Sequence, residues 1–175
     1  MTSRIAQMIE TVIKQHPINA GDLKLEVATQ DVPDRGSSME RNIGGDLYIS
    51  LVRRDKTPPV SKGMLVQAKW DSSIKTDRQL RVQARRMHRR SKDDSYVWSY
   101  GPKGVSAIPS GAFVNPGSIY PEMTAGELIA EGLRCRRGDL RIGRDLGIPR
   151  SAGMRAMLNK LNAEGALEFQ VDHED

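Results

Sequence analysis

The hydrophobic and polar residues of this chain repeat with two periods, which divide it into expected helices and strands. Apolar residues recur every three or four positions over residues 3–15, ahead of Pro17, and this spacing predicts an amphipathic helix. Alternation over residues 23–28 predicts a strand, and residues 46–52 and 63–70 are apolar runs typical of buried strands. Glycines and prolines separate these segments, so we expect turns between them.

The middle of the chain continues with a helix and two further strands. Residues 77–90 place apolar side chains on one side and arginines on the rest, which predicts a helix. Residues 95–100 and 105–108 predict two strands joined by a turn that contains glycine and proline. Residues 109–121, rich in proline and glycine, are expected to connect this part to the C-terminal region.

The C-terminal region is expected to be helical. Thr124 and Glu127 have the spacing of a capping box at the start of a helix over residues 124–135. Ser151 is placed to cap a last helix over residues 152–164, and Gly165 fits the position just beyond its end.

The order of these elements predicts an α/β fold with a mixed central sheet. We expect a core over residues 1–121 and a helical C-terminal extension over residues 122–175. No run of about 18 apolar residues occurs, and the N-terminal segment lacks the apolar centre of a secretory signal, so we expect a cytoplasmic protein with no membrane contact. One cysteine, Cys135, excludes an internal disulfide framework.

The distribution of charge adds a candidate function to this fold. The formal net charge is +5, and residues 75–92 form a run of lysines and arginines that only Asp77 opposes. Basic segments of this density attract phosphate backbones, although a solvated helix face gives the same pattern. A second basic cluster, over residues 134–155, is diluted by Asp139 and Asp145. The candidate nucleic-acid-binding residues are Arg78, Arg81, Arg85, Arg86, Arg89 and Arg90.

Polar residues at the end of the third expected strand are the candidate chemistry. Gln67 and Lys69 are two positions apart, so they share a face, and Asp46 begins the neighbouring strand. A buried lysine needs compensation, which Lys69 obtains structurally if it extends to water or pairs with Asp46. A metal site is the other explanation. Asp46, the Gln67 side-chain carbonyl and the Ala68 backbone carbonyl suit Mg²⁺ or Mn²⁺, and Lys69 would orient or deprotonate the attacking water.

These residues carry a resemblance to a known family. Gly44-Gly45-Asp46, followed by Leu65-Val66-Gln67-Ala68-Lys69, resembles the PD-(D/E)XK restriction-endonuclease-like nuclease superfamily, in its glutamine variant similar to the Mrr-like branch. The resemblance covers roughly residues 1–110. It implies an αβββαβ core and an endonuclease that hydrolyses phosphodiester bonds of DNA with Mg²⁺ or Mn²⁺, with RNA left open as a substrate.

The resemblance also assigns roles to particular residues. Asp46 matches the acid of the second motif, and Gln67 and Lys69 match the third. The first motif has two candidates, Glu10 on the opening helix and Glu40, six residues before Asp46; we favour Glu40 because it lies near the mouth of the strand. The expected catalytic residues are Glu40, Asp46, Gln67 and Lys69, of which Glu40, Asp46 and Gln67 would bind the metal. Gln79 and Gln83 occupy positions where some branches place a further polar active-site residue, and surface polarity explains them equally well.

Two functions from different classes follow. The first is a metal-dependent nuclease, of a kind that often belongs to host defence, including antiviral defence, or to mobile elements. The second is a non-catalytic nucleic-acid-binding or complex-assembly subunit that retains the nuclease fold. Either would be compatible with a homodimer or with a partner subunit. The aromatic residues of the strands, Trp70, Tyr96, Trp98 and Tyr100, are expected in the core more than on nucleobases.

Overall fold

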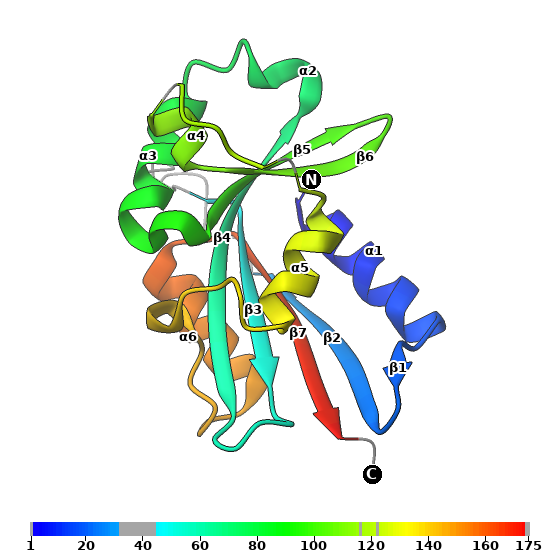
Figure 1. Cartoon of the computed structure of the whole chain (residues 1–175). Coiled ribbons are helices and arrows are strands. Elements are labelled where there is room, and N and C mark those ends of the chain that lie inside the picture. The colour runs from blue at the N-terminus through cyan, green and yellow to red at the C-terminus, as the bar shows by residue number, and fades with distance from the viewer. Residues whose placement is uncertain (1, 32–44, 116, 122, 174–175) are drawn as a thin grey trace.

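The structure is a computed structural model that describes residues 2–31, 45–115, 117–121 and 123–173 (Figure 1). Glu40, the favoured first acid, lies outside the described residues. The helices are α1 (Thr2–Gln15), α2 (Asp71–Ile74), α3 (Leu80–Ser91), α4 (Gly111–Val114), α5 (Ala125–Leu133) and α6 (Arg150–Leu161), with short 3₁₀ turns at η1 (Lys92–Asp94) and η2 (Leu140–Ile142). The strands are β1 (Asn19–Ala20), β2 (Leu23–Asp31), β3 (Leu47–Arg53), β4 (Val60–Trp70), β5 (Ser95–Gly101), β6 (Gly104–Pro109) and β7 (Gly165–His173).

A mixed sheet forms the centre of the molecule. In the described part of the chain its seven strands have the order β1-β2-β7-β3-β4-β5-β6. β3 and β4 form an antiparallel hairpin, and β5 lies parallel to β4 because α2 and α3 carry the chain back across the sheet. β7 is parallel to β3 and antiparallel to β2. The predicted α/β class with a mixed sheet is therefore confirmed.

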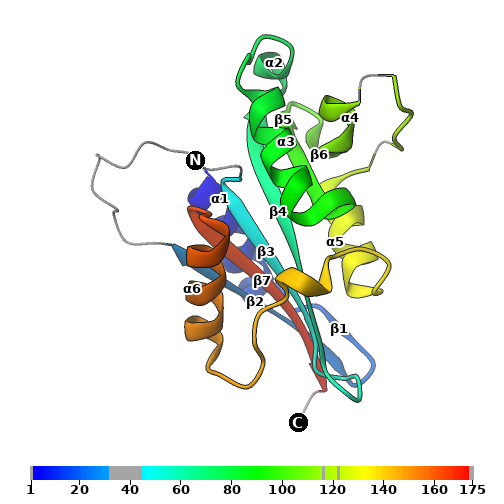
Figure 2. The ribbon, with the colours of Figure 1, turned by 90° about the vertical axis from the view of Figure 1, so that its left-hand side faces the viewer.

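Helices cover both faces of this sheet, which makes a three-layer structure (Figures 1 and 2). α1 and α5 pack on one face, where Ala6 and Leu128 join a core cluster with Val66 of β4. α3 and α6 pack on the other face, where Leu80 and Leu158 meet Leu65 of β4 and other strand residues. Side chains alternate along a strand, so β4 contributes successive residues to the two cores and is buried on both sides.

The expected helices and strands occur in the expected order from α1 to α5 with small shifts at their boundaries, and β1, α2 and α4 are short elements that were not expected. The helix expected over residues 77–90 begins at Leu80, because the Asp77 carboxylate accepts hydrogen bonds from the backbone amides of Gln79 and Leu80. The capping box of Thr124 and Glu127 is present at the start of α5. No helix in the described part of the chain is long and apolar enough to cross a membrane.

The expectation that residues 122–175 are a helical extension is wrong at its end, because β7 is a central strand of the sheet. α6 begins one residue before Ser151, after Pro149, so Ser151 lies within the helix and does not cap it. The helix ends at Leu161, and Asn162 follows it in the left-handed conformation with a φ of 56°. Gly165, expected just beyond a helix end, is instead the first residue of β7.

Candidate active site

Asp46 lies at the mouth of the β3–β4 hairpin. Its backbone amide donates to the Val66 carbonyl at 2.9 Å, which continues the hairpin pairing by one residue beyond Leu47. Its carboxylate Oδ2 accepts a hydrogen bond from Gln67 Nε2 at 2.5 Å and another from the Ala68 backbone amide at 3.1 Å. The structure thus brings together the acid and the amide that the sequence predicted to be neighbours.

The surroundings of Asp46 oppose its negative charge. Burial raises the pKa of this carboxyl above its ordinary value, against the hydrogen bonds from Ala68 and Gln67 and the charge of Lys69, all of which lower it. A divalent cation beside the carboxylate would favour the charged form, because its field replaces the solvation that burial removes. The electrostatics of Asp46 therefore fit a cation ligand.

Gln67 brings its side-chain amide to the same place. Its side chain is buried, at 3% exposure, and its Oε1 has no hydrogen-bond partner among the described residues while Nε2 binds Asp46. An orphaned buried carbonyl oxygen is costly in an apolar interior and is a hard ligand for Mg²⁺. Half a turn of the amide exchanges Oε1 and Nε2 and turns this oxygen toward the Asp46 carboxylate. Gln67 and Asp46 thus fit a divalent metal as two of its ligands.

Other acids do not complete this pair in the described part of the chain. No group of three His, Cys, Asp or Glu side chains placed to hold a metal is found there. Both oxygens of Glu10, the rival first acid, are engaged elsewhere: one pairs with Lys14 at 2.6 Å and the other accepts from the Thr29 amide at 3.1 Å. The structure therefore gives Glu10 a role in joining α1 to β2, and Glu40 remains a prediction.

Lys69 has a partner that the sequence did not suggest. Its ammonium group lies 2.6 Å from Asp77 Oδ2, with both side chains about four-fifths covered. The sequence predicted that Lys69 either extends to water or pairs with Asp46. Its direct contact is instead Asp77. The hydrogen bond from Lys69 also lowers the pKa of Asp77. In the sequence Asp77 stands out only as the one acid of a basic segment, and the turn that carries it back to β4 is not predictable.

The two glutamines of the basic helix differ in position. Gln79 is exposed just before α3 begins, whereas Gln83 faces inward and its Oε1 is buried without a partner among the described residues. Of these two, Gln83 is thus the more enclosed. The aromatic residues Tyr96 and Trp98 are buried in the core as expected, but Trp70 is 56% exposed beside Lys69.

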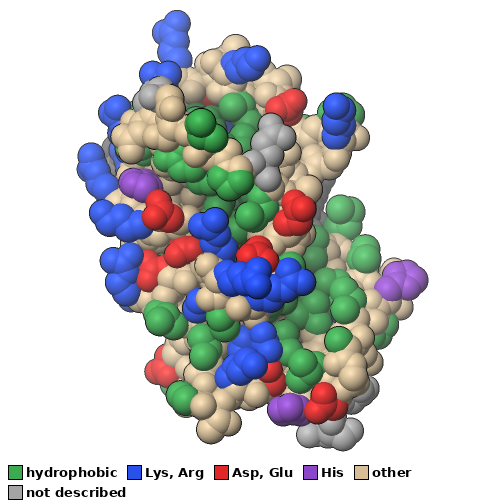
Figure 3. All heavy atoms as spheres, viewed as in Figure 1, with side chains coloured by type: hydrophobic (Ala, Val, Ile, Leu, Met, Phe, Trp, Pro, Cys, Tyr) green, Lys and Arg blue, Asp and Glu red, His purple; other side chains and the backbone are tan. Residues whose placement is uncertain are grey.

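The arginines of α3 form a cationic surface along one edge of the molecule. Lys and Arg side chains gather along the left-hand edge of the molecule, where α3 lies (Figure 3). No ion pair joins them to a carboxylate in the described part of the chain. Arg90 differs from the other arginines of α3, because its guanidinium group donates a hydrogen bond to the Leu161 carbonyl at the end of α6. We call this surface the α3 basic face; it comprises Arg81, Arg85, Arg86 and Arg89 of α3 together with Arg78 just before the helix.

The second basic cluster is largely neutralised. Arg134 and Arg136 both pair with Glu131, at 3.1 and 3.3 Å, and Arg141 pairs with Asp139 at 2.6 Å. Its charge is therefore less available to an external anion than that of the α3 basic face.

Comparisons with known proteins give no relative for this chain. A scan against protein-family models finds no match, and searches of curated proteins and of solved structures find no significant similarity. The function must therefore be argued from the site itself.

Proposed function

We propose that this chain is a metal-dependent endonuclease that hydrolyses phosphodiester bonds of DNA. The observation that carries the proposal is the contact of the Asp46 carboxylate with the Gln67 side chain at the end of a buried hairpin, with Lys69 two residues further on. The succession of α1, β2, β3, β4, α3 and β5 agrees with the αβββαβ order of the restriction-endonuclease-like core. β7 lies between β2 and β3, so these two strands pair with β7 and not with each other.

Each part of the site has a role in this proposal. Asp46, the Gln67 carbonyl and the Ala68 backbone carbonyl would hold Mg²⁺ or Mn²⁺, which when bound supplies Lewis-acid polarisation of the phosphate and its attacking water. Lys69 would orient that water and offset the charge that develops on the phosphate oxygens. The ion pair with Asp77 would hold the Lys69 side chain in place until substrate binds. The α3 basic face would bind the phosphate backbone.

A second function is favoured by one feature of the same site. Asp46 is joined by no further acid among the described residues, and a single carboxylate binds a divalent cation weakly. This favours a DNA-binding subunit that retains the nuclease-like arrangement without cleaving. The two functions make the same prediction for DNA binding and opposite predictions for hydrolysis.

Cleavage assays separate them. Supercoiled plasmid, linear duplex, single-stranded DNA and RNA are each incubated with the protein in Mg²⁺, in Mn²⁺ and in EDTA. We expect metal-dependent cleavage of DNA that Lys69→Ala and Gln67→Ala abolish, with thermal unfolding used to show that both variants fold. Lys56→Ala is the matched control, because Lys56 is an exposed lysine in the turn at the opposite end of the same hairpin. Binding without hydrolysis of any substrate in either metal would overturn the nuclease proposal in favour of the second function.

A further inference from the structure

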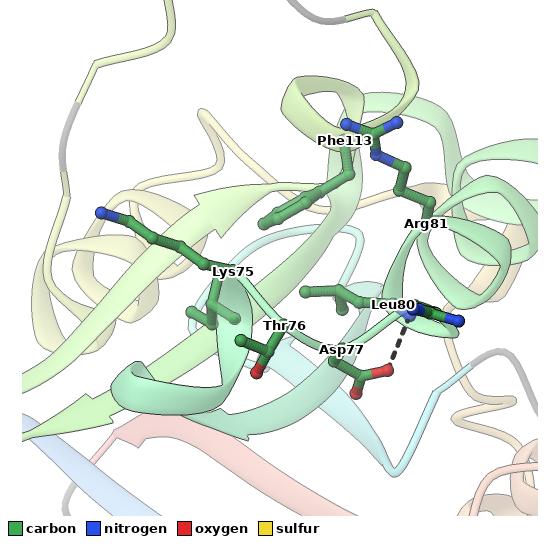
Figure 4. Close-up of a pocket in the computed structure, with 8 residues that line it drawn as sticks. Lys75, Thr76, Asp77, Leu80, Arg81 and Phe113 are labelled. Carbon is green, nitrogen blue, oxygen red and sulfur yellow. Dashed lines mark hydrogen bonds between the residues drawn. The ribbon is translucent and has the colours of Figure 1, made fainter.

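A pocket opens beside the candidate active site, where the segment from α2 to α3 faces α4 (Figure 4). Its volume is about 570 Å³, within the range of sites that bind small organic molecules. Three of its lining residues are apolar, namely Ile74, Leu80 and Phe113, and three are cationic, namely Lys75, Arg78 and Arg81.

The apolar residues form a surface that a flat ring can contact. Leu80 is buried at 1% exposure, and Ile74 and Phe113 are half-buried against the core cluster beneath α3. The Phe113 ring projects into the pocket, with the Lys75 and Arg81 side chains on either side of it (Figure 4). Nucleobases stack on such aromatic surfaces, whatever their sequence.

The cationic residues of the pocket suit the phosphate group of a nucleotide. Lys75, Arg78 and Arg81 are exposed, and no ion pair neutralises them within the described residues. Asp77, the one acid in the lining, has both oxygens engaged, Oδ2 by Lys69 and Oδ1 by the amides at the start of α3. The pocket therefore combines an aromatic surface with a net positive rim.

We propose that this pocket receives one unpaired nucleotide of the DNA substrate. Its base would stack on Phe113, and the phosphates on either side of it would contact Lys75, Arg78 and Arg81. Asp77 lines the pocket and also pairs with Lys69, so this one residue joins the pocket to the candidate active site. The inference rests on the proposed function for the identity of the ligand, and it specifies the preferred DNA.

A preference for single-stranded positions follows from this arrangement. A base in a continuous duplex is paired and stacked, and its removal from the helix costs free energy that an already unpaired base does not require. We therefore expect tighter binding to a duplex with a single-stranded overhang, or to a gapped duplex, than to the same duplex with blunt ends.

The experiment measures binding by fluorescence anisotropy in EDTA, where no metal-dependent cleavage occurs. The probes are a blunt duplex and the same duplex extended by a short overhang. We expect the native protein to prefer the overhang, and Phe113→Leu to weaken overhang binding by about tenfold while leaving blunt binding unchanged. Phe113→Tyr, which keeps a stacking ring, should retain the preference.

Two arginines of the same helix provide a matched control. Arg81 lines the pocket, whereas Arg85, one turn further along α3, does not. Arg81→Gln should reduce the preference for the overhang, and Arg85→Gln should weaken binding to both probes by the same factor. Both residues are exposed, so these variants decide the question even if Phe113→Leu impairs folding.

The possible results separate this inference from the proposed function. Equal binding to the two probes by the native protein, or an unchanged preference in Arg81→Gln, would overturn the pocket assignment even if cleavage is observed. Displacement of the overhang probe by excess free dAMP that requires Phe113 would support it, because the same pocket then receives a base and its phosphate without the rest of the strand. A preference that depends on Phe113 and Arg81 supports the pocket even if no DNA is cleaved.

Discussion

Asp46 shows how a single residue is held in a state that is unfavourable for folding. The β3–β4 hairpin places its carboxylate where burial raises the pKa, while two hydrogen bonds and the nearby Lys69 charge oppose that effect. A raised pKa in the folded protein means that the ionised group destabilises the fold at neutral pH. Such a cost is typical of residues retained for binding or catalysis.

Asp46→Asn is therefore expected to stabilise the protein at neutral pH. The amide oxygen still accepts a hydrogen bond, and the buried charge is removed, so the free energy of unfolding should rise by on the order of 1 kcal/mol. An acid whose folded pKa is raised contributes stability below its unfolded pKa of about 4, and that contribution is lost as the pH rises through the folded pKa. The advantage of the variant should consequently be present at pH 7 and absent near a pH of about 3.5.

Urea denaturation of both proteins at the two pH values measures this difference. The same variant should lose metal-dependent cleavage, because the cation loses its anionic ligand. A variant that is less stable than the native protein at pH 7 would show that the Asp46 charge is favourable to the fold and would contradict the assignment.

The Asp77 carboxylate makes two kinds of contact. One oxygen pairs with Lys69, and the other accepts hydrogen bonds from the amides at the start of α3. Asp77→Asn keeps an acceptor for the cap and should lower the free energy of unfolding by about 0.2–1 kcal/mol, the value of a partly exposed ion pair. Asp77→Ala removes the cap as well and should cost about 1 kcal/mol more. Because Lys69 lowers the pKa of Asp77, the ion-pair contribution exists above pH of about 4 and disappears as the pH falls.

Denaturation curves of the two variants at pH 7 and at pH 3 test this division. Equal losses at pH 7 would show that the cap contributes nothing. A loss in Asp77→Asn that persists undiminished at pH 3 would exclude the ion pair as its cause.

At the scale of elements, the two basic segments differ in whether their charges are already paired. α3 presents arginines with no carboxylate partner in the described part of the chain, whereas Glu131 and Asp139 neutralise the segment after α5. An unpaired cation that meets a phosphate releases a counterion without first losing a protein partner. An arginine of α3 is therefore expected to contribute more to DNA binding than an arginine of the segment after α5.

The salt dependence of DNA binding tests this difference. Replacing Arg85 and Arg89 together by glutamine should weaken binding to every DNA sequence and reduce the slope of log K against log salt by about 0.9 for each phosphate that is no longer neutralised. Arg134→Gln with Arg136→Gln is the matched control, because both arginines pair with Glu131. An equal reduction in the two double variants would show that α3 is not the principal DNA-binding element.

At the scale of the whole molecule, the C-terminal strand is part of the core. β7 lies between β2 and β3, with Leu167 at 0% and Phe169 at 5% exposure. Its Glu168 is also buried, where it pairs with Arg144 and accepts from Ser50 of β3 at 2.7 Å. The buried ion pair joins β7 to the segment after η2, and the Ser50 hydrogen bond joins β7 to β3. Loss of one charged partner would leave the other charge buried and poorly compensated.

Residues 1–164 are therefore not expected to fold without β7. Removal of the strand separates β2 from β3 and exposes two strand edges together with both cores. Circular dichroism and size-exclusion chromatography of the shortened chain should show loss of cooperative unfolding and aggregation. In the full chain, Leu167→Ala should cost about 3 kcal/mol, as expected for a buried leucine. A monomeric, cooperatively folded 1–164 fragment would show that β7 is peripheral.

Much of this structure is predictable because it depends on local pattern. The capping box of α5, the amphipathic α1 and the β3–β4 hairpin each follow from residues close in sequence. The contact between Asp46 and Gln67 belongs to this class, since one short turn and the alternation of side chains are enough to place them opposite each other. Residues 167–171 also alternate apolar and polar side chains, which is a strand pattern, but the place of β7 between β2 and β3 and the burial of Glu168 and Gln170 beside Arg144 depend on tertiary packing.

The sequence by itself determined the class of fold and the pairing of an acid with an amide at one end of a hairpin, because hydrophobic period and strand alternation act over a few residues. Only the tertiary structure decided where Lys69 finds its counter-charge, which basic segment remains unpaired, and that Phe113 of α4 faces the start of α3. These features join residues far apart in the chain, and their geometry depends on the packing of whole elements.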